Sequence, residues 1–469
     1  MLPQSTIVAP ATPPGQGAIA VIRLSGPHSV EICEKVFLPA SGGAKLSGRK
    51  PNSVNFGRLA DGKEILDEVL VTVFRAPHSY TGEDVVEISC HGSPYIRREA
   101  IRLLIDNGAA MAKPGEFTQR AFLNGKMDLP QAEAVADLIA SSSRAFHKVA
   151  VNQMRGGFSK EIKKLREKLL HFVSLVELEL DFSEEDVEFA DRSELKSLLQ
   201  SISEMTGSLT KSFSFGNAIR NGIPVVIAGK PNVGKSTLLN SLVSEEKALV
   251  SEIPGTTRDS IEDVIHIEGI AFRFIDTAGI RETTQKIEIM GIRRTMEKIR
   301  QASVILLMVE ATDTPDHINQ IIEGLREKPE LSGKRIILLL NKSDLPRKEN
   351  SVKPSGDNFP SLDEKDHVVE ISAKKGDGLE NLKGLLVDIV NEGRPKEDDI
   401  VVTNARHYEA LKNAHEAVKR AGDGLDGGLP GDLLAIDIRE VLHYLGEITG
   451  EITTDEILGN IFKNFCIGK

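Results

Sequence analysis

The chain has 469 residues, 40% of them hydrophobic and 27% charged, and carries a net charge of −11. This composition is typical of a folded globular protein, and the negative charge excludes a protein that binds nucleic acid through overall charge alone. The three cysteines, Cys33, Cys90 and Cys466, form no Cys-x-x-Cys pair, so we expect no disulfide framework and no structural zinc site. Apolar runs stay far below the ~18 residues of a membrane helix and no leader pattern precedes them, so we expect a cytoplasmic protein without membrane contact.

Residues 1–125 are expected to form an α+β domain with frequent glycine and proline punctuation. Short runs rich in β-branched residues indicate strands, and an apolar periodicity that stops at Gly108 indicates a helix. The predicted strands are 19–24, 68–74 and 84–88, and the predicted helix is 94–106. We expect Cys33 and Cys90 in the core of this domain.

Residues 126–216 and 388–469 are expected to be largely helical. Apolar residues spaced by three and four follow one another from Ile162 to Val176 and again from Leu195 to Leu209, which predicts two amphipathic helices. A turn is expected in the acidic segment between them, 181–191. In the last stretch the predictions are helices over 406–420 and 434–445 and a glycine-rich loop over 421–431.

Residues 217–387 alternate apolar runs with amphipathic segments, which predicts a doubly wound, mostly parallel sheet. The predicted buried strands are 225–228, 272–275, 304–309 and 336–340. The simplest arrangement joins the two helical stretches into one domain with this α/β domain inserted between them, because domain termini often lie close together.

A phosphate-binding loop is predicted at residues 229–236, GKPNVGKS, which follow a strand and open a helix as the pattern G-x-x-x-x-G-K-[ST] requires. We expect Lys235 to neutralise phosphate charge and Ser236 to ligate Mg²⁺, with the helix dipole adding to the attraction. The predicted contacts are Asn232, Val233, Gly234, Lys235, Ser236 and Thr237.

Three further short motifs follow in order, each at the end of a predicted strand: DTAG at 276–279, NKSD at 341–344 and SAK at 372–374. Asp344 has the chemistry to accept hydrogen bonds from N1–H and the amino group of guanine, which adenine does not offer together. The four motifs therefore predict a GTPase. The predicted nucleotide contacts are Asp276, Thr277, Ala278, Gly279, Asn341, Lys342, Asp344, Ser372, Ala373 and Lys374.

Two catalytic features are less clear from the residues themselves. Thr257, in GTTRD, is the candidate to complete Mg²⁺ coordination. The residue after Gly279 is Ile280, where many small GTPases carry the glutamine that orients the attacking water. Glu282 or Glu288 is an alternative for that role, although either also suits a solvated surface charge. A monovalent cation held beside the phosphates by Asn232 is a further possibility.

Segments along the whole chain resemble the MnmE (TrmE) family, the tRNA-modifying GTPases of bacteria and organelles. The segments are ATPPGQGAIAVIRLSG, SYTGEDVVEISCHG, KPGEFTQRAFLNGKMDLPQAEAVADLI, GKPNVGKS, GTTRD, DTAGIRET and the terminal FCIGK. The resemblance implies an N-terminal α+β folate-binding and dimerisation domain, a helical domain and an inserted Ras-like G domain, with boundaries at 1–125, 126–216, 217–387 and 388–469.

The resemblance also implies site residues. A 5-formyl- or methylene-tetrahydrofolate is expected on Arg23, Glu87, Lys126 and Lys469. K⁺ is expected on Asn232, Ser251, Ile253 and Thr256, and Mg²⁺ on Ser236 and Thr257. The water-orienting glutamate of the family aligns with Glu288 and not with Glu282.

The family implies a homodimer that works with the flavoprotein MnmG (GidA) in a heterotetramer-type complex. The pair is expected to add an aminomethyl or carboxymethylaminomethyl group at C5 of a tRNA wobble uridine, with carbon from folate, while K⁺-stimulated G-domain dimerisation drives the cycle. Cys466 is expected to be essential for modification, although a buried tail cysteine is the alternative. The other functions considered are a ribosome-assembly GTPase, which usually carries a basic RNA-binding module that we do not find, and a non-catalytic scaffold.

Overall fold

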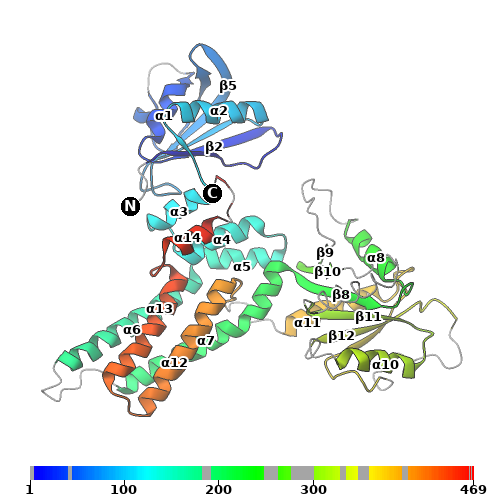
Figure 1. Cartoon of the computed structure of the whole chain (residues 1–469). Coiled ribbons are helices and arrows are strands. Elements are labelled where there is room, and N and C mark those ends of the chain that lie inside the picture. The colour runs from blue at the N-terminus through cyan, green and yellow to red at the C-terminus, as the bar shows by residue number, and fades with distance from the viewer. Residues whose placement is uncertain are drawn as a thin grey trace, which may run out of the picture. The chain divides into compact units, whose positions relative to one another are not determined.

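The computed structural model describes residues 5–40, 45–181, 192–247, 262–275, 300, 302–327, 334–346, 359–392, 400–463, 465 and 467–468. They belong to two compact units, which are described separately (Figure 1). Unit 1 comprises Met1–Ala140, Ala150–Glu204 and Ala410–Lys469, and unit 2 comprises Ser141–Val149 and Met205–Glu409. The predicted division into four stretches remains a prediction.

Unit 1 begins with a seven-stranded sheet in the order β3-β4-β5-β6-β2-β1-β7. Neighbouring strands are antiparallel except for the parallel pair of β1 and β7. The strands are β1 (Ile7–Pro10), β2 (Ile19–Ser25), β3 (Phe37–Pro39), β4 (Val54–Asp61), β5 (Glu64–Phe74), β6 (Val85–His91) and β7 (Ala110–Met111). The three predicted strands are confirmed within β2, β5 and β6, the last beginning one residue later than expected.

One face of this sheet carries the core. Helices α1 (Ser29–Val36) and α2 (Pro94–Asp106) bury apolar residues against the inward-facing positions of the strands, such as Ile22 and Val71. The predicted helix over 94–106 is therefore confirmed as α2, and Cys33 and Cys90 are buried as expected. Because side chains alternate along a strand, the residues between the buried ones point to the opposite face. That open face exposes Ile19, Leu38, Val54, Phe56 and Leu70.

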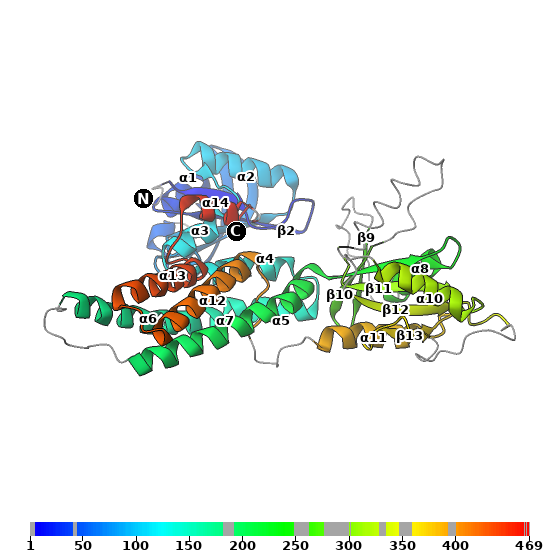
Figure 2. The same cartoon turned by 60° about the horizontal axis from the view of Figure 1, so that its bottom comes forward.

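The rest of unit 1 is helical. Helix α6 (Gly157–Asp181) lies alongside α13 (Gly431–Thr449), although they are far apart in sequence (Figure 2). The predicted amphipathic stripes are confirmed, because Ile162, Leu169, Leu195 and Ile202 are all fully buried. The other helices of this part are α3 (Glu116–Leu123), α4 (Leu129–Ala140), α14 (Asp455–Phe462) and portions of α5 (Arg144–Met154), α7 (Arg192–Asn221) and α12 (Ala405–Asp426).

Helix α12 corrects one expectation, because it continues to Asp426 and includes residues predicted as a glycine-rich loop. Burial of Ala421 favours continuation of the helix over an early glycine stop. Gly424 allows the chain to fold back: a Cβ there would lie 2.5 Å from Cδ1 of Leu429, whose N–H donates to the Gly424 carbonyl at 2.9 Å. Gly428, at φ +70°, supplies the left-handed residue that commonly ends a helix.

Unit 2 is built on a six-stranded sheet in the order β13-β12-β11-β8-β10-β9, parallel except for the antiparallel pair of β9 and β10. The strands are β8 (Ile223–Gly229), β9 (Glu262–Ile267), β10 (Ile270–Ile275), β11 (Val304–Glu310), β12 (Arg335–Asn341) and β13 (His367–Glu370). The four predicted strands lie within β8, β10, β11 and β12; β9 and β13 were not predicted.

Helices cover both faces of this sheet, as the doubly wound prediction requires. Helices α8 (Lys235–Lys247) and α11 (Leu379–Glu392) contribute to one apolar cluster, and α10 (Pro315–Arg326) contributes to a second. Because β8, β11 and β12 are parallel, their carboxyl ends lie at one edge of the sheet, which is where open α/β sheets bind ligands. None of the helices in the described parts of the chain is long and apolar enough to cross a membrane.

The centre of β11 provides a test of this core. Leu306 is fully buried within the α8–α11 cluster. We expect Leu306→Ala to lower the free energy of unfolding of unit 2 by about 3 kcal/mol, because the lost contacts and the remaining cavity both destabilise. Urea unfolding of the nucleotide-free chain measures the change. Leu345→Ala, at a side chain that is 48% exposed, is the matched control, and an equal effect of the two substitutions would contradict the assigned core.

Candidate functional site

The loop between β8 and α8 has positive φ angles at three positions, and glycine or asparagine occupies each of them. Gly229 has φ +152°, and a Cβ there would lie 2.3 Å from the carbonyl oxygen of Met308 on β11. Asn232 has φ +61°, a left-handed conformation that asparagine tolerates better than most residues. Gly234 has φ +109°. The predicted phosphate-binding loop is therefore formed at the end of β8, as its motif requires.

Lys235 closes over this loop. Its Nζ donates to the carbonyl oxygens of Gly229 and Lys230, both at 2.8 Å. An ammonium group held at the start of α8 adds its full charge to the positive end of the helix dipole. Ser236 and Thr237 follow in the first turn of α8 and are exposed, so their hydroxyls face solvent at the same end of the helix. The arrangement suits a bound polyphosphate.

Asn341, at the end of β12, joins this loop to a third segment. Its Nδ2 donates to the carbonyl oxygen of Val233 at 2.7 Å, and its Oδ1 accepts from the backbone N–H of Ala373 at 2.9 Å. The side chain is buried, and so are both partners. The prediction that Asn341 contacts guanine therefore needs an addition: its amide also connects the predicted phosphate-binding and base-binding loops.

The predicted base-binding residues are held by their own contacts. Ser372 donates its hydroxyl to Oδ1 of Asp344 at 2.9 Å, and this hydrogen bond, as the largest cause, lowers the pKa of the Asp344 carboxyl. Asp344 therefore stays ionised throughout the neutral range and remains an acceptor. Ser241 of α8 donates to the carbonyl oxygen of Ala373 at 2.7 Å, which ties the 372–374 loop to the helix after the phosphate loop.

Lys342 and Lys374 complete the predicted contacts within the described residues. Lys342 has φ +66°, and its ammonium forms an ion pair with Glu310 at the end of β11. The remaining predicted residues lie outside the described ones: Ser251, Ile253, Thr256, Thr257, Asp276, Thr277, Ala278, Gly279, Glu288, Cys466 and Lys469. Of the predicted metal ligands, only Ser236 and Asn232 are described. The described residues contain no group of three or more His, Cys, Asp or Glu side chains arranged to hold a metal.

A second cluster lies on the sheet of unit 1. Arg23 on β2 faces Glu87 on β6, and its Nε and Nη2 both contact Oε1 of Glu87, at 2.9 and 2.8 Å. The Arg23 guanidinium lies 5.2 Å from the ring centre of Tyr80 and 5.8 Å from that of Phe117. Its Nη1 donates to the carbonyl oxygen of Gly468, so the described end of the tail reaches this cluster.

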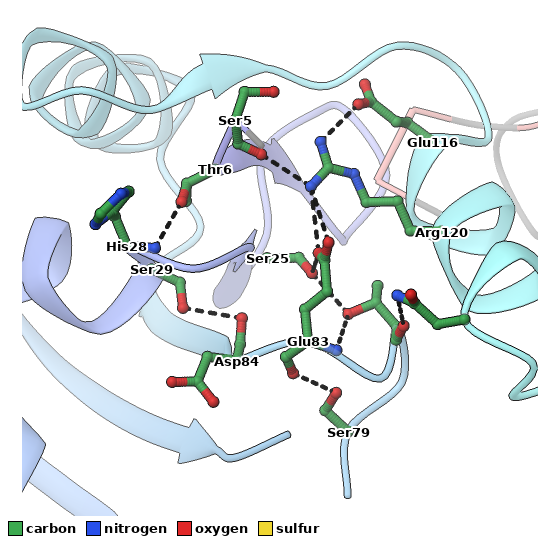
Figure 3. Close-up of polar contacts among 12 residues, drawn as sticks. Ser5, Thr6, Ser25, His28, Ser29, Ser79, Glu83, Asp84, Glu116 and Arg120 are labelled. Atoms are coloured by element: carbon green, nitrogen blue, oxygen red, sulfur yellow. Dashed lines mark hydrogen bonds and ion pairs between the residues drawn. The ribbon is translucent and has the colours of Figure 1, made fainter. Parts of the chain in front are cut away.

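Lys126 lies at the neighbouring loop, where its Nζ donates to the carbonyl oxygen of Pro77 at 2.9 Å. Three of the four residues predicted to bind folate are thus described. Arg23 and Glu87 are in direct contact, and Lys126 contacts the β5–β6 loop that carries Tyr80. Tyr80, Phe117 and a buried polar network around Arg120 (Figure 3) were not predicted as parts of this cluster. Tyr80, Phe117 and Arg120 lie within the segments SYTGEDVVEISCHG and KPGEFTQRAFLNGK that carry the family resemblance, which is a signal for the region, but they form no motif of ligand-binding spacing that assigns each of them a role.

Comparison with known proteins places these observations in a family. The family model described as the MnmE helical domain matches residues 129–466, more than half of the chain. The chain belongs to the MnmE family. The model described as the GTP-binding protein TrmE N-terminus matches residues 6–126, so the two MnmE-type models together account for nearly all of the sequence. The chain is accordingly a GTPase, in agreement with the motifs assembled around Asn341.

Curated MnmE proteins align with the chain along its whole length. The tRNA modification GTPase MnmE of Bacteroides thetaiotaomicron is 54% identical, over 99% of this chain and 100% of its own length. The protein of the same name from Cytophaga hutchinsonii is 53% identical, over 99% and 98% respectively. Among solved structures, Era of Aquifex aeolicus bound to GDP·AlF₄⁻ is 32% identical over 41% of this chain and 65% of its own, with a TM-score of 0.28, too low for a structural comparison.

The two hydrogen bonds of Asn341 lead to a prediction. Asn341→Ala leaves the Val233 carbonyl and the Ala373 N–H buried without this partner, at a cost of about 1–3 kcal/mol for each group. We expect the affinity for a fluorescent GDP analogue to fall by about 10- to 100-fold. Asn217→Ala, at an exposed position of α7, is the control. An affinity within twofold of the unsubstituted chain would show that the connection does not support nucleotide binding.

Proposed function

We propose that the chain uses GTP hydrolysis to drive modification of tRNA at C5 of the wobble uridine. It would add an aminomethyl or carboxymethylaminomethyl group together with the flavoprotein MnmG, in a heterotetramer-type complex. The observation that carries this proposal is that one MnmE-family chain holds its predicted phosphate- and base-binding loops together through Asn341. The same chain has a separate Arg23–Glu87 cluster that the carboxyl-terminal tail reaches.

The N-terminal cluster has the chemistry for a reduced folate, 5-formyl- or methylene-tetrahydrofolate. A pteridine ring presents neighbouring N–H donors, and Glu87 is a carboxylate whose orientation is fixed by two nitrogens of Arg23. Tyr80 and Phe117 supply aromatic surface beside it. Lys126 adds a positive charge at the neighbouring loop for the ligand's glutamyl carboxylates, and Lys469 would add another. Because Gly468 contacts Arg23, the tail that contains Cys466 would act at this same cluster.

A homodimer is supported by the open face of the N-terminal sheet. The exposed apolar side chains there come from neighbouring strands. Phe56 on β4 is directly paired with Leu70 on β5, and Leu38 on β3 is paired with Arg58, two residues after Phe56 on β4. Exposed apolar side chains gathered on one face are typical of a protein interface, and the exposed Arg58–Glu68 ion pair lies among them. A second copy of the chain is a fitting occupant, because a two-fold axis would place the same apolar surface on both sides.

The catalytic centre of the G domain would combine described and undescribed residues. Mg²⁺ would bind Ser236 and Thr257, and K⁺ would bind Asn232, Ser251, Ile253 and Thr256. Asn232 is exposed within the predicted phosphate loop, which leaves its side chain accessible to a cation there. Glu288 would orient the attacking water, since Ile280 cannot. K⁺-stimulated association of two G domains would couple hydrolysis to the modification cycle. With a chain charge of −11, much of the tRNA contact would fall to the partner.

Nucleoside mass spectrometry of total tRNA from cells that lack this chain tests the function. We expect loss of the C5-aminomethyl-type wobble uridines, with recovery by the wild-type chain and not by Cys466→Ser, because the tail would take part in the modification. Cys33→Ser, at a buried core position, controls for thiol loss in general. An unchanged nucleoside profile would reject the tRNA function, and co-sedimentation with ribosomal subunits would then test the ribosome-assembly alternative.

Hydrolysis of GTP tests the proposed role of Glu288. In KCl, Glu288→Ala should lower kcat by at least about 100-fold while nucleotide affinity is retained, because a group that positions or deprotonates water acts on the chemical step. Glu282→Ala is the control, six residues earlier in the same sequence segment. Loss of nucleotide binding in the Glu288 variant, or an equal loss of kcat in both variants, would contradict the assignment.

A further inference from the structure

Helix α3 presents a row of buried side chains to the cluster around Arg23. Phe117, Thr118 and Arg120 are each at most 1% exposed, although one carries a hydroxyl and another a full charge. Phe117 lies beside the Arg23 guanidinium, and Thr118 shares a 2.8 Å hydrogen bond with the hydroxyl of Tyr80. Arg120 contacts neither Arg23 nor Tyr80 directly. Arg120 therefore can affect Arg23 and Tyr80 only through the residues that it contacts.

Arg120 connects three segments that are distant in sequence (Figure 3). Its Nη1 donates to the carbonyl oxygen of Ser5 at 2.9 Å and to the carboxylate of Glu83 at 3.2 and 3.3 Å. Its Nη2 donates to Oε1 of Glu116, one turn earlier on α3, at 2.9 Å. A single lysine nitrogen cannot reproduce this arrangement, because the guanidinium directs its donors in a rigid fork.

Glu83 carries the contact into the β5–β6 loop, residues 75–84. Its Oε2 also accepts from the hydroxyl of Ser25 at 2.6 Å, and that hydroxyl lies 2.6 Å from the hydroxyl of Thr81. Ser79 donates to the Glu83 carbonyl at 2.5 Å. Tyr80 lies between these anchored residues, so the position of its ring depends on the same contacts.

The ends of this loop are fastened independently of Arg120. Asp84 accepts from Nη1 of Arg75 at 2.6 Å and from the backbone N–H of Ala76 at 3.0 Å. The inner part has two anchors of its own, because the Tyr80 hydroxyl bonds to Thr118 and Nδ2 of Asn124 donates to the Thr81 carbonyl at 2.8 Å. Loss of the Arg120 contacts would therefore free the Glu83 side chain and loosen the inner part of the loop around Tyr80 without opening its ends. A buried ionic network of this kind is a weak source of net stability, and its use is to select one arrangement over others.

We propose that Arg120 is a positioning residue of the N-terminal ligand site: through Glu83 it holds the β5–β6 loop so that Tyr80 stays against the guanidinium of Arg23, whose carboxylate partner Glu87 faces the ligand. This inference rests on the proposed binding of a reduced folate by that cluster. It assigns ligand affinity to a side chain that does not touch the ligand.

Arg120→Lys in the full chain tests the proposal, because it keeps the positive charge between Glu83 and Glu116 but loses the fork. Amide hydrogen exchange without ligand should become about tenfold faster in peptides covering 77–83 while α2 is unchanged. Calorimetry should show binding of 5-formyl-tetrahydrofolate weakened by about tenfold. Arg102→Lys, at a half-exposed arginine of α2 with acidic partners of its own, is the matched control, and an unchanged GTP hydrolysis rate reports an intact G domain.

The same Arg120→Lys change in a second variant distinguishes positioning of Tyr80 from a general structural role of Arg120. In a Tyr80→Ala chain the Arg120→Lys change should weaken folate binding by less than about twofold, because the group that it positions is absent. An equal loss of affinity in both backgrounds, or unchanged exchange in the loop, would overturn the proposal. Failure of the wild-type chain to bind the folate would instead reject the folate site, and the exchange measurement would still decide whether Arg120 holds the loop.

Discussion

The hydrogen bonds of Asn341 are the interaction on which the G domain's site depends. Parallel strands bring their carboxyl ends to one edge of a sheet, but the loops that leave those ends have no reason of their own to stay together. The Asn341 side chain connects the loop after β8 to the loop after β13, and Ser241 reinforces the second of these from α8. The predicted phosphate-binding and base-binding loops are therefore held in one arrangement by a buried amide.

In the N-terminal domain a loop is also held by a buried side chain, but the side chain is the charged Arg120 and not an amide. The residues predicted to bind folate lie on strands β2 and β6 and beside the β5–β6 loop, and the residues of α3 that contact them are buried. Arg120 and Thr118 hold the loop, while Phe117 lies against Arg23. In both units the residues closest to the expected ligand depend on a buried polar side chain behind them, and that side chain belongs to a different element.

Patterns that are local in sequence were the ones that could be predicted. The phosphate loop, the central strands of unit 2, helix α2 and the stripe that includes Ile162 all follow from spacing or periodicity over a few residues. The helix through Ala421 was not predicted, because its glycines favour a loop and only tertiary burial favours the helix. Arg120 lies in a segment that carries the family resemblance, but its contacts could not be predicted from sequence, since its partners Glu83 and Ser5 lie 37 and 115 residues away. For Arg23 and Glu87, the family resemblance identified the residues, and the structure adds that they are paired with each other.

Gly234 has a consequence for how such a site can change over evolutionary time. A Cβ at this position would lie 2.4 Å from Nδ2 of Asn341, so the smallest possible side chain in the phosphate loop would displace the residue that leads to the base-binding loop. Gly234 and Asn341 therefore cannot change independently, although they are 107 positions apart in the sequence. A lineage, or a laboratory selection, that places a side chain at Gly234 therefore has to move or replace the Asn341 side chain as well.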